Sequence, residues 1–285
     1  GLNIFLYPMT GFSSNYAIFG TKYGSVDNAY LDDNGQKVDL PEGIAHFLEH
    51  KLFESEDGDA FSKYAKTGAY SNAYTSFDRT CYLFSCSNRF YDNLKILLDF
   101  VRSPYFTEAT VNKEQGIIGQ EIKMYDDMPN WRVMFNMLEG MFYTHPVRID
   151  IAGTVQSIAK ITDKTLYDCY KTFYNPSNMF VCICGNFEIQ KVLDMIDEKI
   201  EDKGKTEIIR STHSEPDTIV NAYIEEKMEV SMPLFVAGIK DTEWTIKRTS
   251  KNIETANLLL ELVAGKTSPL YNKLLSEGLI NNNFS

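Results

Sequence analysis

Short stretches in which apolar and polar residues alternate are interspersed along this chain with longer stretches of helical spacing. Alternation bounded by turn residues predicts strands, and apolar residues at every third or fourth position predict helices. The expected strands cover residues 3–7, 15–23, 70–76, 80–87, 179–184, 221–230 and 234–239. The expected helices cover a stretch beginning near Pro41 and then residues 59–66, 89–101, 107–127, 131–142, 163–174, 189–200, 252–263 and 269–277. Because the two kinds do not alternate strictly, we expect an α+β fold with a mixed or antiparallel sheet flanked by helices.

The helix near Pro41 contains the sequence His46-Phe47-Leu48-Glu49-His50. This H-x-x-E-H order is the inverzincin signature. On a helix His46 and His50 lie one turn apart, so their imidazoles can converge on one metal ion. Glu49 is then placed to take a proton from a water at the metal. Two partly exposed histidines beside a solvated glutamate are the alternative, but the surrounding apolar residues favour a zinc hydrolase.

A third protein ligand is expected, because catalytic zinc sites usually have three. The predicted helix over residues 107–127 carries Glu114 and Glu121, seven positions apart and therefore on one face. One can bind the metal while the other accepts a hydrogen bond from a ligating imidazole. Spacing alone allows surface glutamates on an acidic helix equally well. His145 is another candidate, although a turn or packing role is favoured, and His213 is expected to be solvated.

A polar and charged stretch over residues 201–217 predicts a boundary between two domains. We place a catalytic domain at residues 1–205, the linker at 206–217, and the start of a second, homologous domain at 218–285. In the second domain an apolar helix repeats the pattern of the first, with Leu258 and Leu262 at the positions of the two histidines. We therefore expect two repeated domains, of which the second is incomplete and has no metal ligands.

Composition narrows the class of protein. The net charge of -11 argues against nucleic-acid binding, which needs clustered Lys and Arg. No run of 18 apolar residues is present, so no membrane span is expected. The 5 cysteines form no C-x-x-C pair and are expected to be reduced, mostly buried thiols, which favours a cytoplasmic protein.

Several motifs together resemble the pitrilysin family of zinc peptidases, which includes insulysin and the mitochondrial and bacterial processing peptidases. In chain order they are Gly43 to Glu54, Asn72-Ala73-Tyr74-Thr75, Glu114-x6-Glu121, His145-Pro146, Gly153-Thr154, Tyr174-Asn175-Pro176 and Gly185-Asn186. The resemblance covers nearly the whole chain. It is specific because it joins H-x-x-E-H to a downstream Asn-Ala strand and a helix with paired glutamates. We expect a bacterial member of the processing-peptidase type.

The resemblance implies a role for each residue of the site: zinc ligation by His46, His50 and Glu121, general base catalysis by Glu49, and support of a ligating histidine by Glu114. It also implies an endopeptidase that encloses a peptide or unfolded polypeptide between two halves, and a homo- or heterodimer with a related subunit is possible.

By the same resemblance, the substrate adds as a strand to a sheet edge at Asn72, Ala73 and Tyr74, where backbone pairing provides affinity. Composition alone favours a purely structural strand there. Nearby aromatic residues could line a peptide cleft, but aromatic residues in strands are usually core. They are Tyr64, Tyr70, Tyr74, Phe77, Tyr82 and Phe84.

One family feature is not found. The family completes its site with an Arg-Tyr pair from the other half, and no equivalent pair occurs before Ser285. Losing such donors typically costs about 10²- to 10³-fold in turnover, so we expect this chain alone to bind zinc but to cleave slowly or not at all. The alternative is a peptide-binding or assembly subunit whose partner supplies the chemistry, but the intact His46, Glu49 and His50 favour an enzyme. A structural zinc is disfavoured because no cysteine ligand is available.

Overall fold

The computed structural model describes residues 1–284 except 33, 57, 202–203, 205–206, 212–213 and 242–248. It divides into two units, residues 1–238 and residues 239–285, which are described separately. His213 lies outside the described residues, so its predicted solvation stays a prediction. None of the helices in the described part of the chain has the length and apolar composition needed to cross a bilayer.

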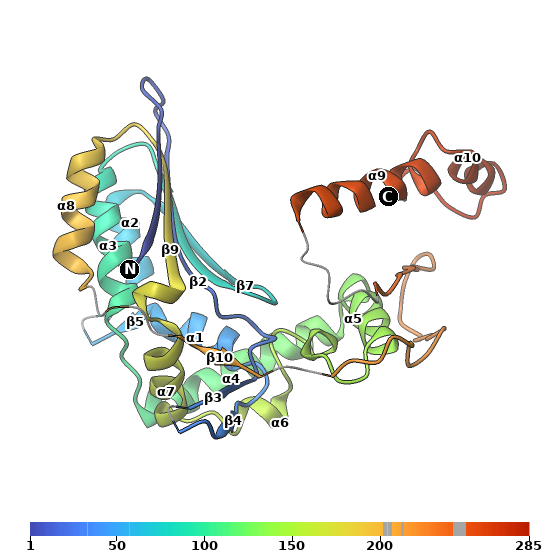
Figure 1. The fold of residues 1–285 in the computed structure, drawn as a ribbon, viewed down its shortest axis with the longest axis horizontal. Helices are drawn as coiled ribbons and strands as arrows, with labels where there is room; N and C mark the ends of the chain where they lie inside the picture. Colours follow the sequence, from blue (N-terminus) through green and yellow to red (C-terminus); the bar gives the residue numbers. More distant parts are fainter. Residues whose placement is uncertain are drawn as a thin grey trace. The chain divides into compact units, whose positions relative to one another are not determined.

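A five-stranded sheet is the framework of residues 1–238 (Figure 1). Its strands, in spatial order, are β1 (Asn3–Pro8), β9 (Met179–Gly185), β2 (Asn15–Thr21), β8 (Thr80–Cys86) and β7 (Tyr70–Thr75). β1 runs parallel to β9, and the other neighbours are antiparallel. The predicted α+β fold with a mixed sheet is therefore confirmed, and β7 forms one edge of the described sheet.

Helices cover one face of this sheet. The three central strands have buried residues at every second position, such as Ala17 and Phe19 on β2 and Tyr82 and Phe84 on β8. That face packs against α1 (Ile44–Leu52), α2 (Ala60–Thr67) and α3 (Phe90–Arg102), and α8 (Ile189–Lys199) lies beside α3 (Figure 1). The period-two pattern of the strands thus fixes the side on which the helix with the histidines lies.

The remaining helices of this unit follow α3 along the chain. They are α4 (Glu108–Asp126), α5 (Pro129–Met141), α6 (Val155–Ile158) and α7 (Asp163–Phe173), with short 3-10 turns at Pro146–Arg148 and Pro176–Asn178. Threonine side chains start three of them by accepting the backbone N–H three residues on: Thr107 for α4, Thr154 for α6 and Thr162 for α7. α4 contacts α1, so the two helices with the predicted ligands pack together.

Two small sheets were not predicted from the sequence. β10 (Ile209–Arg210), β3 (Ala29–Leu31) and β4 (Lys37–Asp39) form one, and β5 (Glu54–Ser55) pairs with β6 (Gly58–Asp59) in the other. Strands of two or three residues are too short to show a hydrophobic period. β10 lies within the predicted linker, and the Arg210 guanidinium donates to Asp27 at 2.6 Å. The boundary between the two repeated domains stays a prediction.

The predicted strands over residues 221–230 and 234–239 are wrong. Both stretches are irregular, and none of the described strands pairs with either. A strand needs a neighbour for its backbone N–H and C=O groups, and an alternating pattern alone does not supply one. This part of the chain bonds to α5 instead, because the N–H of Asn221 donates to the carbonyl of Gly140 and the Glu226 carboxylate accepts from Asn136.

The unit of residues 239–285 contains two helices, α9 (Ser250–Ala264) and α10 (Pro269–Ser276). Both were predicted from the sequence and are confirmed. Their starts are capped by the side chains of Thr249 and Ser268, which accept from the backbone three residues on.

The start of α1 depends on one glycine. Gly43 has a φ of +84°, and a Cβ there would lie 2.3 Å from the carbonyl oxygen of Ala152. The Ser157 hydroxyl also donates to the carbonyl of Glu42 at 2.9 Å. The segment that leads into α6 is therefore held against the N-terminus of the helix that carries the histidines.

We expect Gly43→Ala to lower the free energy of unfolding by about 2 kcal/mol or more, because it combines a left-handed backbone with a clash against backbone. The control is Gly116→Ala in α4, where a Cβ meets nothing within 4 Å. That change should raise the free energy of unfolding by about 0.5–1 kcal/mol, because alanine has a higher helix propensity than glycine. Denaturant unfolding measures both, and equal effects of the two substitutions would contradict this account of Gly43.

Candidate metal centre

Three side chains from two helices converge beside the sheet. His46 and His50 come from α1 and Glu121 comes from α4, and one potential ligand atom from each lies within 4.8 Å of the others. Nε2 of His46 lies 3.7 Å from Oε1 of Glu121, and Nε2 of His50 lies 3.4 Å from Oε2. Among the described residues this is the one group of three or more His, Cys, Asp or Glu side chains with such spacing.

The separations suit a small divalent cation. Tetrahedral zinc with ligand bonds of about 2.0–2.1 Å requires donor atoms about 3.3 Å apart. Both nitrogen-to-oxygen distances at Glu121 are close to that value. Two imidazoles with one carboxylate also form a donor set found in catalytic zinc sites, so these side chains could hold a zinc ion.

Glu114 orients the second histidine. Nδ1 of His50 lies 3.0 Å from Oε1 of Glu114, whose side chain is buried. With the proton on Nδ1 donated to Glu114, the lone pair of Nε2 faces Glu121. Burial alone would raise the pKa of Glu114, but the hydrogen bond from His50 outweighs it and the pKa is lowered. Spacing in the sequence left open which of the two glutamates accepts a hydrogen bond from a histidine. In the structure Glu114 faces His50.

The pKa values of the two imidazoles are shifted in opposite directions. Burial, with a smaller contribution from His50, lowers the pKa of His46 to about 3, so this ring is neutral at physiological pH. Burial also lowers the pKa of His50, but the hydrogen bond to Glu114 and the nearby carboxylates outweigh it, and the pKa is raised. A neutral His46 is the form that can bind a metal.

Glu49 lies next to this cluster and is 8% exposed. The Thr75 hydroxyl donates to its Oε2 at 2.6 Å. Burial raises the pKa of Glu49, although the hydrogen bond from Thr75 acts in the opposite direction. A carboxylate with raised proton affinity, fixed by a neighbour at one oxygen, has the properties of a general base.

Tyr125 is a contact of the site that sequence reasoning missed. Its hydroxyl donates to Oε1 of Glu121 at 2.7 Å. Burial and this hydrogen bond raise the pKa of Tyr125, so the hydroxyl stays protonated. The available signal was its position four residues after Glu121 on one helix, where side chains are neighbours.

The predicted substrate strand lies at a sheet edge. Asn72, Ala73 and Tyr74 belong to β7, and Thr75, the next residue, contacts Glu49. Asn72 Oδ1 accepts the N–H of Ala73 at 2.9 Å. Of the aromatic residues considered for a cleft, Tyr64, Tyr82 and Phe84 are buried core, Phe77 is half-buried, and Tyr70 and Tyr74 are 63% and 39% exposed.

His145 is not part of the cluster. Its Nδ1 accepts the N–H of Val147 at 3.1 Å and caps the turn at Pro146–Arg148. The predicted turn role is therefore confirmed for this histidine.

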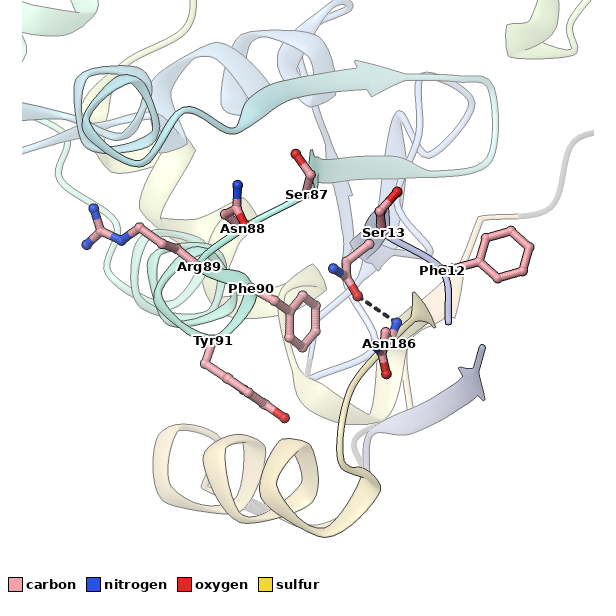
Figure 2. A pocket seen from close by; sticks show the side chains of 9 residues that line it. Phe12, Ser13, Ser87, Asn88, Arg89, Phe90, Tyr91 and Asn186 are labelled. Carbon is pink, nitrogen blue, oxygen red and sulfur yellow. Dashed lines mark hydrogen bonds between the residues drawn. The ribbon is translucent and has the colours of Figure 1, made fainter. Parts of the chain in front are cut away.

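A separate pocket of about 400 Å³ lies at the other end of the sheet (Figure 2). It is lined by the turn before β2, the end of β8 and the start of α3, including Asn15, Ser87 and Phe90. The register pairs Asn15 with Cys86 at that end and Thr75 with Thr80 at the end near Glu49. None of the residues predicted for the site lines this pocket.

Family models match most of the chain. Residues 35–155 match the model described as Insulinase (Peptidase family M16). Residues 160–285 match the model described as Peptidase M16 inactive domain.

Three similar proteins show how far the likeness extends. An uncharacterized zinc protease of Bacillus subtilis, YmfH, is 47% identical over 100% of this chain and 68% of its own length. A crystal structure of an M16-like peptidase from Alicyclobacillus acidocaldarius is 39% identical, with a TM-score of 0.89 over 100% of this chain and 68% of that one. A probable mitochondrial-processing peptidase subunit beta of Arabidopsis thaliana is 26% identical over 58% of this chain and 32% of its own length.

The chain thus spans about two thirds of the first two proteins and less of the third. The resemblance inferred from the motifs is confirmed by the family models and by YmfH. The chain belongs to peptidase family M16, the insulinase family.

Proposed function

We propose that this chain carries the catalytic site of a zinc-dependent endopeptidase acting on peptides or unfolded polypeptides. The observation that carries the proposal is the position of Glu49, a buried carboxylate on α1 between the two histidines that feels the charges of His50 and Glu121. A structural metal site has no need for an additional base. The names of the zinc protease relatives support the same reaction class.

In this proposal His46, His50 and Glu121 are the zinc ligands, and Glu114 holds the proton on Nδ1 of His50. A zinc ion there would supply a Lewis acid that polarises the scissile carbonyl. The donor set and its spacing support zinc over a cation that prefers only oxygen ligands.

Glu49 moves the proton. Because the Thr75 hydroxyl occupies Oε2, Oε1 is the oxygen that accepts a proton from the attacking water. The same carboxyl then donates this proton to the leaving amine nitrogen. Burial raises the pKa of Glu49, which makes the carboxylate a stronger base for the first step.

The edge strand β7 is the proposed site of substrate binding. An added strand would pair with the backbone of Asn72, Ala73 and Tyr74, and the oxygen of the Asn72 side chain would be displaced from the Ala73 N–H by a substrate carbonyl. Backbone pairing gives affinity for extended polypeptides with loose sequence preference. Thr75 continues the strand to Glu49, so a bound strand lies beside the base.

A second function, as a peptide-binding or assembly subunit with a related partner, is favoured by the match of residues 160–285 to a domain described as inactive. The arrangement of Glu49 and Thr75 favours the enzyme. The five cysteines are free thiols, which supports a reducing compartment, and we propose the cytoplasm.

We expect the purified protein to bind one zinc per chain and Glu121→Gln to lose most of it, because the amide cannot supply the anionic oxygen ligand. Elemental analysis after desalting measures this. The control is Glu108→Gln, an exposed glutamate on the same helix, which should keep the zinc. Failure of the wild type to take up zinc at neutral pH would contradict the proposal and favour the peptide-binding subunit.

We expect Glu49→Gln to keep zinc and to lose peptide cleavage by about 10²- to 10⁴-fold, because the amide cannot accept the proton. A quenched fluorescent peptide assayed with and without a chelator measures the zinc-dependent rate. Glu56→Gln, an exposed glutamate shortly after the same helix, is the control and should cleave at the wild-type rate. A rate that neither the chelator nor Glu49→Gln reduces would refute Glu49 as the base.

A further inference from the structure

Tyr125 links the carboxylate of Glu121 to a supporting layer of side chains. Its hydroxyl donates to Oε1 of Glu121, and its ring stacks on Trp131 with centroids 4.6 Å apart and planes 17° apart. The indole N–H of Trp131 donates to the carboxylate of Asp150. The ring of Tyr125 therefore has a fixed position, and its hydroxyl is fixed with it.

The same contacts lead back to α1. The other carboxylate oxygen of Asp150 accepts the N–H of Ala152 at 2.9 Å, and the carbonyl of Ala152 lies against Gly43 at the start of α1. One connected set of contacts thus runs from Glu121 on α4 to the helix that carries His46 and His50. It fixes the two helices at a point apart from the cluster itself.

The two oxygens of Glu121 have different surroundings. Oε1 accepts from Tyr125 and lies 3.7 Å from Nε2 of His46, whereas Oε2 lies 3.4 Å from Nε2 of His50 and accepts no hydrogen bond from the residues that the structure describes. A hydroxyl hydrogen bond on one oxygen fixes the rotation of the carboxylate. The other oxygen is then held toward Nε2 of His50.

We infer that Tyr125 is a positioning residue for Glu121, which selects Oε2 as the single metal-binding oxygen by holding Oε1. This inference rests on the proposed function, because it assumes that Glu121 binds zinc. Partners that orient a metal ligand typically contribute about 10- to 100-fold to metal affinity. The hydroxyl of Tyr125 acts through Glu121, so we expect its effect to be on metal binding.

The test is the zinc dissociation constant of Tyr125→Phe, measured by competition with a chromophoric chelator. The substitution keeps the ring on Trp131 and removes only the hydroxyl. We expect zinc to bind about 10- to 100-fold more weakly than in the wild type. We also expect a smaller rise of the melting temperature on adding zinc, with an unchanged melting temperature in the presence of a chelator.

Tyr170→Phe is the matched control. Tyr170 also stacks on an aromatic ring, that of Tyr174, and donates one hydrogen bond to a carbonyl, that of Val101, at 2.9 Å. Loss of the Tyr170 hydroxyl should leave the zinc affinity unchanged, even if it lowers the free energy of unfolding. An equal loss of zinc affinity in both variants would assign the effect to general packing and overturn the inference.

The outcomes separate this inference from the proposal on which it rests. If the wild type binds one zinc and Tyr125→Phe binds it with the same affinity, Tyr125 is not a positioning residue while the zinc site stands. If the wild type binds no zinc, both fall together. A weaker affinity confined to Tyr125→Phe supports the inference.

Discussion

The structure depends on an electrostatic constraint at the meeting of α1 and α4. Glu49, Glu114 and His46 are all buried, and Glu121 is close to them with its side chain 22% exposed. Burying several carboxylates together is costly unless cations or hydrogen bonds compensate. His50, Thr75 and Tyr125 each supply a hydrogen bond to one of the three carboxylates. A divalent cation among His46, His50 and Glu121 would compensate the remaining negative charge, so the fold holds a charge arrangement that a metal ion would stabilise.

The rest of the fold serves to hold these groups in place. The sheet fixes β7, and β7 brings Thr75 to Glu49. The left-handed Gly43 lets the segment around Ala152 approach the start of α1, and Asp150 connects that segment through Trp131 and Tyr125 to Glu121. Residues more than 70 positions apart in the sequence therefore define the geometry of a few ångströms between nitrogen and oxygen atoms.

The candidate ligands could be proposed from the sequence because their spacing on a helix is local. His46 and His50 are one turn apart and Glu114 and Glu121 two turns apart, and neither fact depends on tertiary structure. The choice between the two glutamates could not be made from spacing, since both share one face. Their different partners, His50 and Tyr125, depend on how α1 and α4 pack, and only the folded chain shows them.

The wrong and missed strand predictions also arise because tertiary structure decides what local patterns cannot. Residues 221–230 and 234–239 alternate like strands, but strand formation requires a partner and this segment bonds to α5 instead. β10 and β3 are too short for any periodicity, and their pairing joins residues far apart in the chain. Local patterns therefore predicted the longer helices and the long strands, but not the one-turn helix α6, and pairing choices came from tertiary structure.

The most direct measurement of the central claim is anomalous diffraction at the zinc absorption edge from crystals grown with stoichiometric zinc. The account predicts one peak bonded to Nε2 of His46, Nε2 of His50 and Oε2 of Glu121 at about 2.0–2.2 Å, next to but not bonded by Glu49. A zinc peak at another place, or no peak among these three side chains in zinc-loaded protein, would contradict it.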